Sequence, residues 1–280
     1  MKIPDVILAT ASYRKEVAKD VVEHYEEVVD SEEEYEESEE GTVTLALDKQ
    51  VSGVRGRTNY ALLELYNQKG YDVFKETCMR MKGNNWFNKE EYSTFKGECA
   101  EVYLYVTVLE FIKKYELPWK AYLSLVIPHR SGEAGQTTEL DLVLVSEEMI
   151  TVFEAKSYGG DKKIKDVCTI SRKGGNTDIY RQNALHCESL IKQIADYNIN
   201  DQRGMKSVLF SYAEGSLTDV RDAKYKKLMP VVTEDNLLKY LTQLTKLSSK
   251  FWKASIFEKV DGLSNALTME DHMKHINSKK

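Results

Sequence analysis

One stretch constrains the fold more than any other: Glu139 to Gly160, which reads ELDLVLVSEEMITVFEAKSYGG. It contains two runs in which apolar and polar residues alternate, joined by a short polar segment, a pattern typical of a β-hairpin. With the turn at residues 146–149, the register places Asp141 opposite Glu154. Two carboxylates facing each other at about 5 Å repel. The sequence therefore predicts that a cation lies between them.

The same register brings a lysine to these carboxylates. Lys156 follows Glu154 by two residues, so the two side chains share a face of the second strand, and Glu139 is expected opposite Lys156. Mg²⁺ and Mn²⁺ prefer oxygen ligands, and such an ion polarises a phosphoryl oxygen and helps to generate hydroxide from water. A neighbouring lysine can orient that water or stabilise the transition state. These residues predict metal-dependent phosphodiester hydrolysis; the alternative is an exposed hairpin with a simple Glu139–Lys156 ion pair.

One helix is predicted before the hairpin in the sequence, and another after it. An amphipathic helix is expected at residues 90–115, with Glu98 on its apolar face. A lone carboxylate there is costly unless something pairs with it. A second helix is expected at residues 180–197, where Gln182 and His186 lie one turn apart. The other expected elements are strands at 122–127, 167–172, 206–212 and 229–232, a loop holding His129 and Arg130, and a helix capped by Thr233.

Taken together, these residues resemble a known group of nucleases. Asp141, then Glu154-x-Lys156 on the next strand, after a helix bearing Glu98, looks like the PD-(D/E)XK nuclease superfamily. Within it the sequence is similar to the NERD (nuclease-related domain) family, over about residues 95–245. The motifs that carry the resemblance are Gly97-Glu98, ELDLVLV from Glu139, FEAKSYGG from Phe153, and YRQN from Tyr180 with His186.

The resemblance implies both a fold and a set of functional residues. The fold is α/β, with a restriction-endonuclease-like core, a central mixed β-sheet flanked by helices, and here an N-terminal extension. Asp141 and Glu154 would bind Mg²⁺ or Mn²⁺, and Glu98 would be a further ligand or would orient a water. Lys156 would be catalytic, and Gln182 would support the site from the later helix.

Acidic residues are concentrated near the N-terminus of the sequence. The first 50 residues carry 15 of the 45 acidic and 5 of the 39 basic side chains, so the remainder carries 30 acidic and 34 basic. The tract SEEEYEESEE at 31–40 is typical of a solvated, disordered segment, with a nucleic-acid mimic or an autoinhibitory plug as the alternative.

We expect an acidic, partly disordered extension at 1–50, a small α/β extension at 51–90, the nuclease-like domain at 91–245 and a C-terminal helical tail at 246–280. Within 51–90 we expect a loop at 54–57, a helix from Thr58 to Lys69 and a strand at 71–74.

The mildly basic remainder permits a nucleic-acid partner. A cluster of basic residues follows the Gly-Gly pair of the hairpin, and we expect it to hold a phosphate backbone. DNA is the first choice of substrate, from the resemblance, and RNA the second; a homo-oligomer, or a partner protein in a defence or repair complex, stays open. The basic residues are Lys162, Lys163, Lys165, Arg172, Lys173 and Arg181.

Other functional classes find little support in the sequence. No run of about 18 apolar residues is present, so no membrane partner is expected. Four scattered cysteines without a Cys-x-x-Cys pair favour a reducing cytoplasm over a disulfide framework or a zinc site. Neither a Gly-x-Ser-x-Gly motif nor a phosphate-binding Gly-x-x-x-x-Gly-Lys-Ser/Thr loop occurs. The remaining alternatives are a non-cleaving nucleic-acid- or protein-binding module on the same fold and a hydrolase of small phosphoesters.

Overall fold

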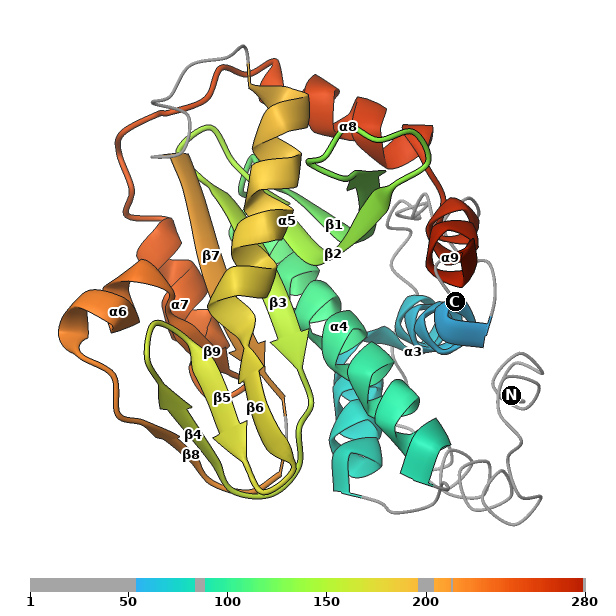
Figure 1. Cartoon of the computed structure of the whole chain (residues 1–280), viewed down its shortest axis with the longest axis vertical. Coiled ribbons are helices and arrows are strands. Elements are labelled where there is room, and N and C mark those ends of the chain that lie inside the picture. Colours follow the sequence, from blue (N-terminus) through green and yellow to red (C-terminus); the bar gives the residue numbers. More distant parts are fainter. Residues whose placement is uncertain (1–53, 84–88, 196–203, 213, 279–280) are drawn as a thin grey trace. The chain divides into compact units, whose positions relative to one another are not determined.

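The computed structural model describes residues 54–83, 89–195, 204–212 and 214–278 (Figure 1). The expected acidic extension at 1–50 lies outside these residues. The chain divides into two compact units, with the boundary in the sequence between residues 99 and 100. None of the helices described here has the length and apolar character needed to cross a membrane.

The first unit is helical in its described part. Helix α3 (Val54–Gly83) is interrupted at Gly70, whose φ of 78° lies in the left-handed region that glycine adopts without steric cost. Its buried face includes Leu62, Leu63, Phe74 and Cys78. The expected break at Gly70 is confirmed, but the loop at 54–57 and the strand at 71–74 were wrong, because both segments are helical. A segment of four residues is too short to distinguish a strand from a turn of helix.

Helix α4 (Lys89–Lys114) begins in the first unit and ends in the second. The expected helix at 90–115 is therefore confirmed almost residue for residue. In the second unit α4 packs on the central sheet through Tyr103, whose ring stacks on Phe210 and lies 5.0 Å from that of Tyr212. The left-handed Glu116, with a φ of 49°, follows directly after its last turn.

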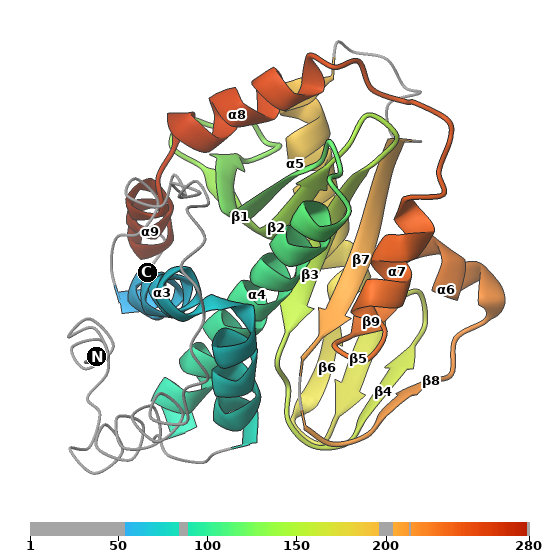
Figure 2. The same ribbon diagram turned by 180° about the vertical axis from the view of Figure 1, so that it is seen from behind.

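The second unit is built on a five-stranded mixed sheet in the order β1-β2-β3-β7-β9 (Figures 1 and 2). The first three strands are antiparallel neighbours, and β7 and β9 continue the sheet in parallel. The predicted hairpin register is confirmed from Val145–Ile150 to Leu142–Phe153, but the strands do not pair at Asp141–Glu154 or Glu139–Lys156. The strands are β1 (Lys120–Pro128), β2 (Thr137–Val145), β3 (Ile150–Lys156), β7 (Met205–Ser211) and β9 (Val231–Thr233).

Helices cover both faces of this sheet, as expected for the predicted fold class. Helix α5 (Ile179–Ile194) crosses one face and packs beside α8 (Ile256–Ala266), as Figure 1 shows. Figure 2, from behind, shows α4 and α7 (Leu237–Leu244) over the other face. Tyr240 of α7 meets Phe153 edge to face. Asn236, not Thr233, is the N-cap residue of α7, and its side chain accepts a hydrogen bond from the Thr233 N–H.

A second, four-stranded sheet follows the hairpin, in the order β6-β5-β4-β8. The expected strand at 167–172 is confirmed as β5, but it lies between two further short strands, β4 and β6, and β8, which follows β7, pairs with β4. Its buried face places Ile164 and Ile170 in one apolar cluster with Leu209 of the central sheet. The strands are β4 (Lys162–Lys165), β5 (Thr169–Arg172), β6 (Gly175–Asp178) and β8 (Leu217–Asp219), and helix α6 (Ala223–Leu228) follows β8.

The C-terminal segment is helical, with α8 followed by α9 (Met269–Ser278). It is not a detached tail, because both helices pack on the central sheet. Lys120 and the Tyr122 hydroxyl, on β1, donate to Asp261 of α8 at 2.6 and 2.7 Å. His272 of α9 is buried beside Thr137 of β2, with 2.9 Å between Nδ1 and Oγ1.

Candidate active site

Asp141 lies where strands β2 and β3 stop pairing. Their register runs from Val145–Ile150 to Leu142–Phe153 and ends there. The next N–H on β3 that faces β2, that of Ala155, donates to the side chain of Asp141 at 2.8 Å. A carboxylate thus takes the place of a strand carbonyl as the acceptor. The two strands continue with their outer neighbours, β2 with β1 and β3 with β7.

The pairing of β2 with its other neighbour, β1, is also irregular next to Asp141. Strand β1 pairs with β2 at Leu123–Leu142 and Leu125–Leu140. Ser124 between them has a left-handed φ of 50°, which is uncommon for a residue other than glycine. Its buried hydroxyl makes no hydrogen bond within the described residues. Backbone strain of this kind concentrates at functional sites, and here it flanks the aspartate singled out from the sequence.

Glu154 is completely buried, and each of its carboxylate oxygens meets a different basic side chain. The Lys156 amine donates to Oε1, and the Nδ1 atom of His186 on α5 lies 3.2 Å from Oε2. Lys156 and His186 retain 17% and 12% of their side-chain exposure, so they are the edge of the site that solvent reaches. A buried carboxylate needs such partners, because removal from water is costly for an unpaired charge.

The electrostatics of the two carboxylates differ. Burial raises the pKa of Asp141 to about 7, and the charge of Glu154 adds to this increase. Burial also raises the pKa of Glu154, but His186 and Lys156 outweigh it and hold that pKa below its usual value. Burial lowers the pKa values of Lys156 and His186, yet in both cases Glu154 reverses the effect, so the net pKa is raised. The partners of Glu154 therefore favour its charged form, whereas burial and the charge of Glu154 disfavour the charged form of Asp141.

The donor set fits a hard divalent cation. Asp141 and Glu154 supply oxygen ligands from adjacent strands, and their mutual repulsion is the feature that a cation would relieve. Across the described residues, no group of three or more His, Cys, Asp or Glu side chains is arranged to hold a metal. Two carboxylates suit Mg²⁺, which usually keeps several of its own waters.

One family model matches the part of the chain that holds this site. Residues 96–211 match the family model of the nuclease-related domain. The chain contains a nuclease-related domain. The match includes β1 to β3, α5 and β7, and therefore every residue of the site just described. None of the curated proteins matches the chain.

Two solved structures are remotely similar. Protein VC1899 from Vibrio cholerae is 16% identical over 69% of this chain, with a TM-score of 0.35. The chain spans about half of that protein, 50% of its length. A protein of unknown function, AF1548, is 11% identical; the match covers 62% of this chain and 95% of that one, with a TM-score of 0.29.

Three further residues were expected at the centre of the nuclease-related domain. Glu98 is buried on α4 but belongs to the first unit, so the geometry of the second unit does not test it. Gln182 is half-buried on α5, and the described residues show no hydrogen bond from it to either carboxylate. Glu139 was expected to pair with Lys156, but Lys156 pairs with Glu154. Glu139 instead lies 3.9 Å from His272, at ion-pair distance.

Only some side chains of the expected basic cluster are exposed to solvent. Lys163, Lys173 and Arg181 are exposed, and Lys165 is half-buried. Arg172 lies over the ring of Tyr158, with its guanidinium carbon 4.2 Å from the ring centre. Lys162 corrects the prediction: it is buried, and its amine donates to the carbonyls of Gly160 and Glu214. A side chain held in this way does not face solvent as a phosphate contact would.

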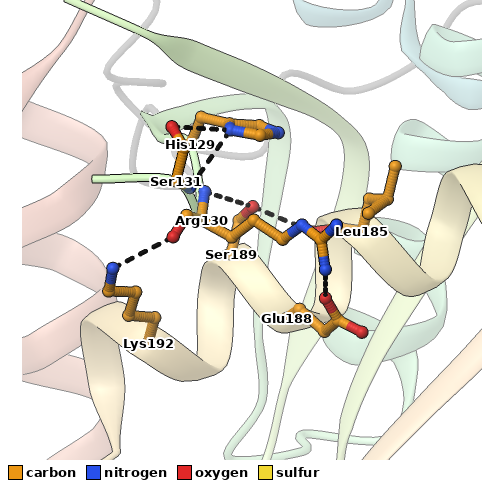
Figure 3. Close-up of polar contacts among 7 residues, drawn as sticks. All are labelled: His129, Arg130, Ser131, Leu185, Glu188, Ser189 and Lys192. Carbon is orange, nitrogen blue, oxygen red and sulfur yellow. Dashed lines mark hydrogen bonds and ion pairs between the residues drawn. The ribbon is translucent and has the colours of Figure 1, made fainter. Parts of the chain in front are cut away.

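Sequence reasoning missed two roles at this site. His186 was named as one mark of the family resemblance and for its position one turn after Gln182, but no role was assigned to it. His272 lies outside the matched family segment and had no signal at all. The expected loop that holds His129 and Arg130 is present, and Figure 3 shows it lying against α5. There the Arg130 N–H donates to Ser189 and its guanidinium pairs with Glu188.

Proposed function

We propose that this protein is a metal-dependent nuclease that hydrolyses phosphodiester bonds of DNA. The observation that carries the proposal is the placement of Asp141, Glu154 and Lys156 at the point where two central strands part. The membership of residues 96–211 in a nuclease-related family supports the same activity.

Each residue has a distinct task in this proposal. Asp141 and Glu154 would hold Mg²⁺ or Mn²⁺. When bound, such an ion neutralises charge on the scissile phosphate and makes a water more acidic. Lys156 reaches the site on a flexible stem and can donate to a phosphate oxygen or hold the attacking water. Lys163, Lys173 and Arg181 offer exposed charge for the phosphate backbone.

The test is cleavage of supercoiled and linear DNA, and of RNA as a second substrate, with Mg²⁺ or Mn²⁺. Asp141→Asn and Lys156→Met keep side-chain size while removing charge, and we expect each to reduce the rate about 100-fold or more. Lys224→Met, which changes an exposed lysine on α6, is the matched control and should cleave as the wild type does. A chelator should abolish cleavage and added Mn²⁺ should restore it. Wild-type protein that binds DNA but leaves it intact with either ion would refute the proposal.

A second candidate is a nucleic-acid-binding module that does not cleave. It is favoured by one observation: both oxygens of Glu154 already contact basic side chains, Lys156 and His186. DNA binding that is unchanged by Asp141→Asn and independent of metal, without cleavage, would support this candidate.

The setting of the proposed activity is also a proposal. None of the chain's cysteines, at 78, 99, 168 and 187, forms a disulfide, which suits the reducing cytoplasm. DNA repair or defence against foreign DNA would give such a nuclease its substrate. Incubation of extracts from the native host with the immobilised full chain would identify partners in either process.

A further inference from the structure

The side chain of Glu154 raises a question about its two partners. Glu154 is fully buried; Lys156 donates to Oε1, and Nδ1 of His186 lies 3.2 Å from Oε2, an ion-pair contact without hydrogen-bond geometry. Lys156 is the residue expected to act on the substrate. If it turns toward a phosphate, Glu154 loses one of its two partners. Something else must then keep the carboxylate in position.

His186 is better suited than Lys156 to be the permanent partner. A lysine amine sits on four rotatable bonds, whereas a histidine ring has two. His186 also projects from a helix with contacts on either side of it. Before it, Asn183 is fully buried and its amide donates to the carbonyl of Val152 at 3.1 Å, two residues from Glu154 on β3.

After His186, the loop between β1 and β2 holds the same helix (Figure 3). The N–H of Arg130 donates to the Ser189 hydroxyl at 3.0 Å, and Lys192 donates to the Arg130 carbonyl at 3.0 Å. The N-terminus of α5 is capped by Asp178, whose carboxylate accepts from the N–H of Arg181 at 2.9 Å. The helix is thus held at several points along its length, so the backbone that carries His186 is fixed relative to Glu154.

We propose that His186 is a positioning residue, which holds Oε2 of Glu154 through Nδ1 while Lys156 acts on the substrate. This inference rests on the proposed function for its purpose, but the contact itself does not depend on cleavage. Residues that orient a metal-binding carboxylate in this way typically change metal affinity or activity 10- to 100-fold when they are replaced.

Two substitutions separate positioning from simple packing. His186→Asn places an amide N–H near the position of Nδ1 and should preserve the contact. His186→Leu fills similar space without a donor. Glu188→Gln is the matched control on the same helix, since Glu188 pairs with Arg130 rather than with Glu154.

The first measurement is Mn²⁺ binding to the full-length chain by calorimetry, together with kcat and KM. We expect His186→Leu to weaken Mn²⁺ binding by about 10- to 100-fold and to lower kcat more than it raises KM. His186→Asn should recover most of both losses, and Glu188→Gln should match the wild type. Equal Mn²⁺ affinity and kcat in wild type and His186→Leu would overturn the inference while leaving the nuclease proposal intact.

The second measurement needs neither metal nor substrate. In protein labelled with [¹⁵N]histidine, the chain's five histidines give separate ring signals, and His186→Asn identifies the one from His186. Glu154→Gln should shift that signal more than the other four, because it alters the acceptor that faces Nδ1. An unshifted His186 signal overturns the inference. A shifted signal in a wild-type protein that neither binds Mn²⁺ nor cleaves supports the contact and removes only the proposed nuclease function.

Discussion

Replacing Lys162 should weaken folding and leave DNA binding unchanged. Its amine donates to the Gly160 carbonyl at 2.7 Å and to the Glu214 carbonyl at 2.8 Å. The loops that carry these two acceptors approach each other closely: a Cβ added to Gly215 would lie only 2.5 Å from the backbone of Gly160. A hydrogen bond to a charged group contributes about 1.5–3 kcal/mol. We therefore expect Lys162→Met to lower the free energy of unfolding by about 3 kcal/mol.

Lys163 offers a matched control one residue away. It has the same charge, but it is exposed on the opposite face of β4. Lys163→Met should change the free energy of unfolding by no more than about 0.5 kcal/mol. If Lys163 contacts a phosphate, its loss should reduce the slope of log K against log salt by about 1.

The assay is urea denaturation followed by tryptophan fluorescence, with DNA affinity measured at several salt concentrations for each variant. Lys162→Met should move the urea midpoint and leave the salt slope unchanged, and Lys163→Met should do the reverse. A lower salt slope for Lys162→Met at unchanged stability would show that the amine reaches DNA and would refute the structural role argued here.

Other predictions concern stability. Arg221→Leu should cost about 3 kcal/mol, because buried Arg221 donates to both oxygens of Asp219 at 2.9 Å and to three backbone carbonyls; a urea midpoint like that of the wild type would contradict this. Burial raises the pKa of Asp219, but hydrogen bonds from Arg221 outweigh it and hold the pKa below its usual value. The pair therefore stabilises the fold above the unfolded pKa of aspartate and loses this contribution as pH falls through the lower folded value. An acid titration of stability should be shallower in Arg221→Leu than in wild type. Tyr122→Phe removes the 2.7 Å hydrogen bond to Asp261 and should cost about 1 kcal/mol, measured as a lower melting temperature.

The central hairpin was predictable because its information is local. Alternation with a period of two sets which residues share a face, and the short turn sets the register, so the pairing of Val143 with Val152 followed directly. The mixed sheet flanked by helices was implied by the family resemblance, whereas periodicity located the individual helices and strands, because the two have distinct periods. The same local rule could have placed Lys162 correctly: it is two residues before Ile164 in a strand, and both are buried.

Errors arose where a short segment carried too little pattern. Residues 71–74 look like a strand in isolation, but they continue a helix after the break at Gly70. The basic segment after the hairpin was expected to form one strand and instead contributes three strands to a second sheet. Strand β8, which completes that sheet, lies more than fifty residues after β4, so no local pattern connects them.

The sequence by itself determined which residues could do chemistry: Asp141, Glu154 and Lys156 on one face of a hairpin. Only the tertiary structure decided their partners. Lys156 turns to Glu154 rather than to Glu139, and His186 reaches Glu154 from a helix 32 residues further along the chain, between residues 154 and 186. The physical reason is that strand periodicity specifies a face, whereas the partner of a buried charge is set by whichever helix packs on that face.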